Sequence, residues 1–336
     1  MKKNKVLIIA EAGVNHNGKL LLAKKLVDVA VKAKADIIKF QTFKTENIVT
    51  KNLERAAYQK KYNKIKQTQY EMLRKLQLSE EDQIKLFKYC NLKKIRFLST
   101  PFDIESFLFL KKLNLNLYKI PSGEITNIPL LKKIGAENKK IILSTGMSTL
   151  KEIEIALKIL NNSGTKKNKI TVLHCTTEYP APFQDLNLNA IQTLKNKLKV
   201  DVGYSDHSSG IEVAIAAVAL GATIIEKHFT LNKKFEGPDH SASLCPDELI
   251  QMTASIRNIE KALGSSKKLV TKSERKNLKM VRKYIVASKI IKKGDKFSQT
   301  NLTTKRSGRG ISAIEWFNLL GKISKKNYSI DSIITD

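Results

Sequence analysis

The sequence predicts an α/β protein built as a (β/α)8 barrel, the TIM-barrel fold, with a small separate domain at its C-terminal end. Two observations predict this. A short strand-like apolar run alternates eight times with a helix-like amphipathic stretch, which is typical of parallel βα units. After Gly264 this alternation stops. Eight βα units suffice to close a barrel, and a length of 336 residues leaves room for an appended domain.

The predicted elements follow in a regular order. Eight strands are expected at residues 6–10, 36–40, 95–99, 117–120, 140–144, 170–175, 201–204 and 223–227. Amphipathic segments between and after them predict helices that include 20–34, 104–113, 150–161, 210–220 and 246–263. One connection, 45–92, is longer than the others and is expected to contain an excursion and two helices, 69–76 and 80–91.

A change in residue composition near the end of the barrel sets the predicted domain limits. Residues 267–279 are polar and basic, and short β-like pieces begin near residue 285. We therefore predict a barrel domain at 1–270, a linker at 271–281 and a second domain at 282–336.

Composition excludes several classes of protein. The net charge of +30 invites a nucleic-acid partner, but most lysines occupy solvent-facing positions of the predicted helices, and no segment interleaves aromatic with basic residues. No apolar run is long enough to span a membrane, and the run at 6–10 is too short for a signal peptide. We expect a cytoplasmic protein that binds neither nucleic acid nor membrane. The three cysteines form no C-x-x-C pair and are expected to be reduced packing residues.

Polar residues cluster where the predicted strands end, which is where barrel enzymes place their catalytic groups. All five histidines of the chain lie at these ends or in the loops that follow. The residues concerned include Glu11, Lys39, Gln41, Thr100, Lys119, Ser122, Glu124, Ser144, Thr177, Tyr179, Ser205, His207, Glu226 and His228.

Two histidines, His207 and His228, end neighbouring strands and could share a metal ion. With only two protein ligands, water and substrate oxygens would fill the other positions. This suits an octahedral Mn²⁺, or alternatively Mg²⁺, that acts as a Lewis acid. Histidines held at the rim by hydrogen bonds are the alternative interpretation.

Two lysines, Lys39 and Lys119, end the second and fourth strands. A lysine there can form a Schiff base or hold an anion, and it can also be a structural salt-bridge partner. The hydroxyl groups of Thr100, Ser144 and Ser205 could converge on the same cavity, which favours an anion site.

These residues lie in motifs that resemble those of the bacterial N-acetylneuraminate synthases, including the related legionaminic and pseudaminic acid synthases. The resemblance covers almost the whole chain, and the set of motifs is specific although each one alone is weak. The motifs are Ile9-Ala-Glu-Ala-Gly-Val-Asn-His-Asn-Gly18, Ile38-Lys-Phe-Gln-Thr42, Ser99-Thr-Pro-Phe-Asp103, Lys119-Ile-Pro-Ser-Gly-Glu124, Leu143-Ser-Thr-Gly-Met147, His174-Cys-Thr-Thr-Glu-Tyr-Pro180, Tyr204-Ser-Asp-His207, Ile225-Glu-Lys-His-Phe-Thr230 and Gly237-Pro-Asp-His240.

The resemblance implies a small C-terminal antifreeze-like (SAF) domain that swaps to the active site of a partner in a homodimer and brings Arg306 to the sugar. It implies that an N-acylated mannosamine faces Glu11, Gln41, Tyr179, His228 and Asp239. It implies that phosphoenolpyruvate is held by Lys39, Thr100, Lys119, Ser122, Ser144, Ser205 and His207. Two departures from the family pattern are Thr177, where some members have Asn, and Ser307, where Pro is usual.

The predicted reaction joins C3 of phosphoenolpyruvate to the aldehyde carbon of an open-chain hexosamine that the metal polarises. Water adds at C2, and the intermediate loses phosphate with carbon–oxygen cleavage. Glu124 is the candidate for the water proton. Lys119, His207 and His228 complete the expected catalytic set.

The expected product is N-acetylneuraminate from N-acetylmannosamine. The alternative is legionaminate or pseudaminate from a 2,4-diacetamido-6-deoxy hexose, with Phe102, Tyr179 and Phe183 discriminating between hydroxyl and methyl at C6. Two readings outside this class are a Schiff-base aldolase and a sugar-binding protein.

Overall fold

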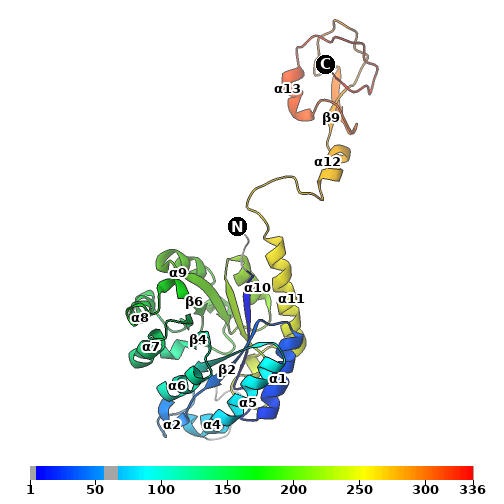
Figure 1. Ribbon diagram of the computed structural model, residues 1–336. Coiled ribbons are helices and arrows are strands. Elements are labelled where there is room, and N and C mark those ends of the chain that lie inside the picture. The colour runs from blue at the N-terminus through cyan, green and yellow to red at the C-terminus, as the bar shows by residue number, and fades with distance from the viewer. Residues whose placement is uncertain (1–4, 57–66, 336) are drawn as a thin grey trace. The chain divides into compact units, whose positions relative to one another are not determined.

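The computed structural model describes residues 5–56 and 67–335. The chain divides into two compact units, Met1–Gly264 and Ser265–Asp336, and each is described by itself. Figure 1 shows the first unit as a ring of strands surrounded by helices. No helix in the described part of the chain is both long and apolar enough to cross a membrane.

The first unit contains eight parallel strands that form a nearly closed barrel, so the predicted fold class is confirmed. The hydrogen-bonded order is β3-β2-β1-β8-β7-β6-β5-β4, and the two end strands, β3 and β4, lie next to each other. The strands are β1 (Leu7–Gly13), β2 (Ile37–Thr42), β3 (Arg96–Pro101), β4 (Leu117–Ile120), β5 (Lys140–Ser144), β6 (Ile170–Cys175), β7 (Asp201–Asp206) and β8 (Ile224–His228).

Five strands run further than the sequence predicts, because the residues that follow remain paired in the parallel ladder. Strands β1, β2, β3, β7 and β8 continue past residues 10, 40, 99, 204 and 227. Glu11, Gln41 and Ser205 therefore lie within strands rather than in loops. A strand residue has less freedom than a loop residue, so these side chains are held at fixed positions.

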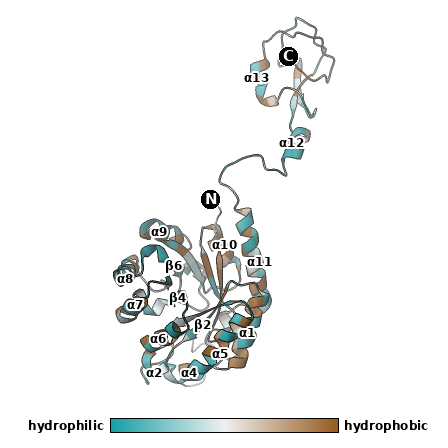
Figure 2. Ribbon diagram, in the orientation of Figure 1, coloured by the Kyte–Doolittle hydropathy of each residue, from teal (hydrophilic) through white to brown (hydrophobic). Residues whose placement is uncertain are grey.

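Helices cover the outside of the barrel. They are α1 (Leu20–Lys32), α2 (Thr45–Ile48), α4 (Gln69–Leu76), α5 (Glu80–Leu92), α6 (Ile104–Lys112), α7 (Ile128–Gly135), α8 (Leu150–Asn162), α9 (Ala190–Leu198), α10 (Glu212–Ala219) and α11 (Pro246–Ala262). Helix α9, largely teal in Figure 2, buries only Ile191, Leu194 and Leu198, as expected for an amphipathic surface helix. Capping residues fix where several of these helices begin. At the start of α8, for example, Thr149 and Glu152 form a capping box.

The interior of the barrel is filled in layers. One layer, the barrel floor, consists of buried aliphatic side chains: Ile9, Ile37, Leu98, Ile142, Leu173 and Ile224. Because successive strand residues point to opposite faces, the residue two positions later on each strand points inward again. On most strands that residue is polar: Ile9 is followed by Glu11, Ile37 by Lys39, and Ile224 by Glu226. The floor therefore supports a polar layer nearer the carboxyl ends of the strands.

The second unit has its own small core. Strands β9 (Tyr284–Ala287) and β10 (Leu302–Lys305) pair antiparallel, and α12 (Arg275–Val281) and α13 (Trp316–Leu319) flank them in sequence. Its buried apolar residues are Ile285, Ala287, Ile291, Phe297, Leu302, Leu319, Tyr328 and Ile334. Because this cluster is separate from the barrel core, the unit is a domain in the structural sense.

Candidate active site

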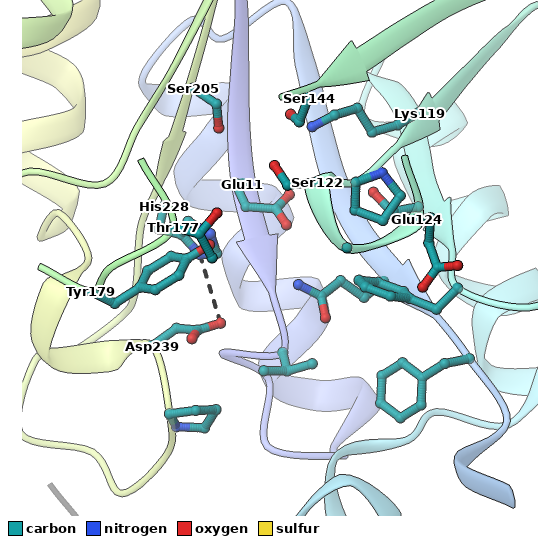
Figure 3. Close-up of a pocket in the computed structure, with 18 of the residues that line it drawn as sticks. Glu11, Lys119, Ser122, Glu124, Ser144, Thr177, Tyr179, Ser205, His228 and Asp239 are labelled. Carbon is teal, nitrogen blue, oxygen red and sulfur yellow. Dashed lines mark ion pairs between the residues drawn. The ribbon is translucent and has the colours of Figure 1, made fainter. Parts of the chain in front are cut away.

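A cavity of about 400 Å³ lies at the carboxyl ends of the barrel strands. Figure 3 shows side chains from several strands and loops pointing into it. With the exception of Phe183, the structure brings together around it the site residues predicted in the barrel: Glu11, Lys39, Gln41, Thr100, Phe102, Lys119, Ser122, Glu124, Ser144, Thr177, Tyr179, Ser205, His207, His228 and Asp239.

Four buried ionisable side chains, which we call the charged layer, form the base of the cavity: Glu11, Lys39, Lys119 and Glu226. Lys119 Nζ lies 2.8 Å and 2.9 Å from the two carboxylate oxygens of Glu226. Lys39 Nζ lies 3.0 Å from Glu11 Oε1 and 3.6 Å from Glu226 Oε2. Each of the four side chains is at most 5% exposed, so solvent screens these interactions only weakly.

The two carboxylates of the charged layer differ in protonation. Burial raises the pKa of Glu11 to about 7, and Lys39 offsets only part of this rise. Burial opposes ionisation of Glu226 as well, but Lys119 and Lys39 outweigh it and hold the pKa of Glu226 well below its usual range. Below about pH 7 the layer thus holds two ammonium groups against one carboxylate, and Glu11 adds a second negative charge as the pH rises through 7. Such a surplus of buried positive charge favours an anion.

Hydroxyl groups surround this positive charge. Lys39 Nζ donates to Thr100 Oγ1 at 3.0 Å, and Ser205 Oγ donates to Glu226 Oε1 at 2.9 Å. Ser122 and Ser144 line the same part of the cavity. Hydroxyl donors beside ammonium groups can supply charge-assisted hydrogen bonds to a phosphate or carboxylate.

The position of Thr177 depends on a close backbone approach. The backbone N–H of Gly146 donates to Ser122 Oγ at 2.9 Å, and a Cβ at Gly146 would lie 2.1 Å from Thr177 Oγ1. Thr177 Oγ1 is buried and has no hydrogen-bond partner among the described residues. The hydroxyl is therefore available to a ligand, although it is shorter than the Asn of some family members.

The two histidines approach each other at the mouth of the charged layer. The ring centroids of His207 and His228 are 5.6 Å apart, and Tyr179 packs against His207 with a centroid distance of 4.2 Å. His207 Nδ1 donates to the carbonyl oxygen of Thr176 at 2.6 Å, because a carbonyl can only accept. In the neutral ring this leaves a lone pair on Nε2, which lies 3.3 Å from Tyr179 Oη.

His228 is also suited to coordination. Its Nδ1 is buried without a hydrogen-bond partner in the described structure, and the nearest carboxylate, that of Asp239, is 3.8 Å away (Figure 3). Burial lowers the pKa of His207 to about 4, and burial together with His207 lowers the pKa of His228 well below its usual value. Both rings are neutral at pH 7, the form that binds metals. Among the described residues no cluster of three or more His, Cys, Asp or Glu could hold an ion, so a metal here would need ligands from water or substrate.

Two further carboxylates lie around the cavity. Glu124, in the short helix η1 (Ser122–Glu124), accepts a hydrogen bond from Asn127 Nδ2 at 2.6 Å, and burial raises the pKa of Glu124. Burial raises the pKa of Asp239 to about 6, with a smaller opposing effect from Lys39. Both carboxyl groups can therefore take up a proton more readily than an exposed one.

The side of the cavity formed by the long β2–β3 connection is apolar. Val14, Phe43 and Met72 are buried there together, and Ile48, Leu73 and Phe102 pack against them. We call these six residues the apolar wall, and all of them line the cavity. Of the six, only Phe102 was predicted, because a strand-end pattern carries no signal for side chains supplied by α2 and α4. Phe183 is 61% exposed and does not line the cavity.

Sequence reasoning also passed over Glu226, which it noted at a strand end but gave no role. The alternation Ile224, Glu226, His228 on β8 was the available signal, since it places the carboxylate inward between the barrel floor and a predicted metal ligand. Arg306 directly follows β10 in the second unit, is exposed, and stays a prediction as a site residue. The adjacent Ser307 Oγ donates to the carbonyl oxygen of Arg309 at 2.7 Å, which closes a local turn where Pro is usual.

The fold and the cavity define the class: a TIM-barrel protein with a cavity at the carboxyl ends of its strands, lined by buried lysines, carboxylates and hydroxyl groups. Comparison with known proteins identifies the group within that class. The NeuB family model matches residues 26–268 and the SAF domain model matches residues 282–336, so the chain belongs to the NeuB family and has a C-terminal SAF domain.

Several relatives are similar over almost the full length. The N,N'-diacetyllegionaminic acid synthase of Campylobacter jejuni is 54% identical, covering 99% of both chains. The enzyme of the same name from Legionella pneumophila is 44% identical over 96% of this chain and 91% of its own. The crystal structure of the N-acetylneuraminic acid (sialic acid) synthetase of Leptospira borgpetersenii superposes with a TM-score of 0.71 at 36% identity, covering 82% of this chain and 90% of that chain.

Proposed function

We propose that this protein is an N,N'-diacetyllegionaminic acid synthase, which condenses phosphoenolpyruvate with a 2,4-diacetamido-6-deoxy hexose and water and releases phosphate. One observation carries the proposal: a single cavity joins a buried, positively charged base to an apolar wall. The relatives that are 54% and 44% identical carry this name, which favours it over the N-acetylneuraminate that the sequence suggested first. N-acetylmannosamine is the second candidate acceptor, supported by the sialic acid synthetase of similar structure.

Phosphoenolpyruvate matches the charged layer. It is a small molecule with a carboxylate and a phosphate, and Lys39 and Lys119 offer two ammonium groups with hydroxyls from Thr100, Ser122, Ser144 and Ser205 beside them. Burial lowers the pKa of Lys119, and the bidentate contact with Glu226 opposes this fall by stabilising the ammonium form, which is the form that binds an anion and not the form that attacks a carbonyl.

His207 and His228 are proposed to hold a divalent metal, Mn²⁺ in preference to Mg²⁺. Their neutral rings and the lone pair on His207 Nε2 fit this role. When bound, the metal would supply Lewis-acid polarisation of the acceptor's aldehyde oxygen.

The remaining chemistry belongs to the chain's own residues. The electrons of the C2=C3 double bond form the new carbon–carbon bond to the aldehyde carbon, and the aldehyde oxygen takes up a proton and becomes a hydroxyl. Water adds its oxygen to C2 and gives up a proton. The C2–O bond to phosphate then breaks with its electrons leaving on phosphate, and the hydroxyl at C2 loses its proton and becomes the ketone. Glu124 is the proposed acceptor of the water proton, since its raised pKa brings it nearer to working pH. Asp239, Gln41 and Tyr179 would orient the sugar.

The apolar wall suits the acceptor that we propose. A 6-deoxy sugar with two acetamido groups presents methyl groups where N-acetylmannosamine presents hydroxyls. Burying methyl groups against Ile48, Leu73 and Phe102 is favourable, whereas a hydroxyl would lose its hydrogen bonds to water there.

The SAF domain is proposed to complete the site in a homodimer, with Arg306 reaching the partner's sugar. Chains carrying Arg306→Ala and chains carrying His228→Ala should each be inactive alone. Mixing them after dissociation should restore part of the activity, because one site per mixed dimer then has both residues. No recovery of activity in dimers that are shown to be mixed would contradict the exchange of SAF domains between partners.

We also propose that the protein is located in the cytoplasm.

The function is tested by measuring the release of phosphate from phosphoenolpyruvate in the presence of Mn²⁺, with each acceptor sugar assayed in parallel. We expect kcat/KM at least about tenfold higher for 2,4-diacetamido-6-deoxymannose than for N-acetylmannosamine. A preference for N-acetylmannosamine would overturn the choice of acceptor, and no phosphate release with either would overturn the proposed reaction. Borohydride with either substrate should trap no lysine adduct, whereas an adduct at Lys39 or Lys119 would support the aldolase reading.

A further inference from the structure

Two loops at the mouth of the barrel are joined by a set of side chains that do not line the cavity. The β1–α1 loop contributes Asn15 and Asn17, and the β8–α11 loop contributes His240 and Ser243. The second loop also carries Asp239, which does line the cavity. We call these four side chains the latch.

One arm of the latch leads to the backbone of Asp239. Asn15 Nδ2 donates to the carbonyl oxygen of Phe229 at 2.8 Å and to Ser243 Oγ at 2.9 Å. Ser243 Oγ in turn donates to the carbonyl oxygen of Asp239 at 2.6 Å. Asn15 and Ser243 are both 1% exposed, so water does not compete for these bonds.

The other arm fixes the loop on either side of Asp239. Asn17 Nδ2 donates to the carbonyl oxygen of Glu236 at 2.9 Å, and Asn17 Oδ1 lies 3.2 Å from His240 Nε2. An amide oxygen only accepts, so Nε2 carries the ring proton, and Nδ1 of the neutral ring accepts from Thr230 Oγ1 at 2.6 Å.

The backbone is shaped to fit this arrangement. A Cβ on Gly237 would lie 2.6 Å from the His240 ring and 3.0 Å from Asn17 Oδ1. Only glycine allows the loop to pass this close to the latch. The result places the Asp239 carboxylate 3.8 Å from His228 Nδ1, on the side of the cavity shown with a dashed line in Figure 3.

We propose that Asn15, Asn17, His240 and Ser243 are positioning residues that hold Asp239 in place for the acceptor sugar. They act through the loop and not by touching the substrate, so their loss should affect the acceptor and spare phosphoenolpyruvate, whose charged layer lies within the paired strands and not in the loops. This inference rests on the proposed function only in assigning the sugar to Asp239.

The test uses two variants in the full-length protein. Ser243→Ala breaks the arm to Asp239, and Asn17→Gly removes the other arm while keeping the left-handed backbone at Asn17, whose φ is 49°. We expect the KM for the acceptor to rise about tenfold in each, with the KM for phosphoenolpyruvate and the kcat changed less than about twofold.

Thr165→Val is the matched control. Thr165 is buried, and its hydroxyl donates to the carbonyl oxygen of Gly135 at 2.7 Å, which joins a loop to the C-terminal end of α7 outside the cavity. The Thr165→Val variant should lose about as much thermal stability as the latch variants, without a change in the KM for the acceptor or for phosphoenolpyruvate. The latch has no positioning role if the folded latch variants change the KM for the acceptor and the KM for phosphoenolpyruvate equally, or change neither.

A failure of the proposed function would be recognised separately, because the wild-type protein would then release no phosphate. In that case hydrogen exchange of the peptide that spans residues 230–243 tests whether the latch holds the loop in place. Faster exchange there in Ser243→Ala and Asn17→Gly, but not in Thr165→Val, supports the latch, and unchanged exchange contradicts it.

Discussion

The charged layer and the apolar wall line the same cavity but have different origins. The charged layer stands on β1, β2, β4 and β8, two residues beyond the barrel floor, so the strand repeat dictates its geometry. Most of the apolar wall comes from loops and from α2 and α4 in the β2–β3 connection. Under the proposed function, the reaction chemistry is built into the strands of the barrel, whereas the choice of sugar is set by a connection that can vary without disturbing those strands.

The largest expected effect comes from breaking the charged layer. Lys119→Met leaves Glu226 without its bidentate partner, and we expect a loss of stability of about 3–5 kcal/mol together with severely weakened phosphoenolpyruvate binding. Unfolding in denaturant and calorimetric titration with phosphoenolpyruvate measure the two effects.

A second buried ion pair provides the control. Lys227 Nζ lies 2.8 Å from Asp206 Oδ2, both side chains are 0% exposed, and neither lines the cavity. Lys227→Met should lose comparable stability but weaken phosphoenolpyruvate binding at least about tenfold less than Lys119→Met. Equal effects on binding would mean that Lys119 is only a structural partner.

The sequence could predict the charged layer better than the wall for a physical reason. Lys39 and Lys119 follow the apolar residues Ile37 and Leu117 at the two-residue repeat, a local pattern that can be recognised without any knowledge of the fold. Met72 and Leu73 reach the cavity only because α4 packs against the barrel mouth, and this depends on tertiary contacts. The role of Glu226 was missed because its pairing with Lys119 spans 107 residues of sequence.

Changing pH tests the protonation of the charged layer. Because the folded pKa of Glu11 is about 7 against an ordinary value of 4.5, the folded state keeps a proton that the unfolded state has lost between these values. This contribution to stability is present below pH 4.5 and is lost as pH rises to about 7.

Glu11→Gln isolates that contribution. The unfolding free energy of the wild type minus that of the variant should fall by on the order of 1–3 kcal/mol between pH 4.5 and pH 7.5, measured by chemical denaturation. A difference that stays flat would show that Glu11 is ionised throughout. Other titrating groups, including the buried histidines, cancel in the comparison.

The apolar wall should control the acceptor alone. Leu73→Gln places a polar group where the 6-deoxy sugar is proposed to bind, and we expect its preference over N-acetylmannosamine to fall about tenfold. The KM for phosphoenolpyruvate should not change. Leu108→Gln on α6, where Leu108 is 44% exposed and outside the cavity, is the control and should leave the preference as it is.

The smallest expected effect is at Thr177. Thr177→Asn restores the residue found in some family members and adds a donor near the hydroxyls of the anion site. The close approach of Gly146 limits the room for it, so we expect the KM for phosphoenolpyruvate to change by less than about threefold. A change above tenfold would give Thr177 a larger part in anion binding.

A crystal structure of the protein soaked with phosphoenolpyruvate and Mn²⁺ would show directly whether the charged layer binds the anion and the two histidines bind the metal. We expect the anion within hydrogen-bond distance of the Lys39 and Lys119 ammonium groups, and an anomalous manganese peak at the imidazoles of His207 and His228. Phosphoenolpyruvate bound away from both lysines, or manganese bound away from both histidines, would contradict this expectation.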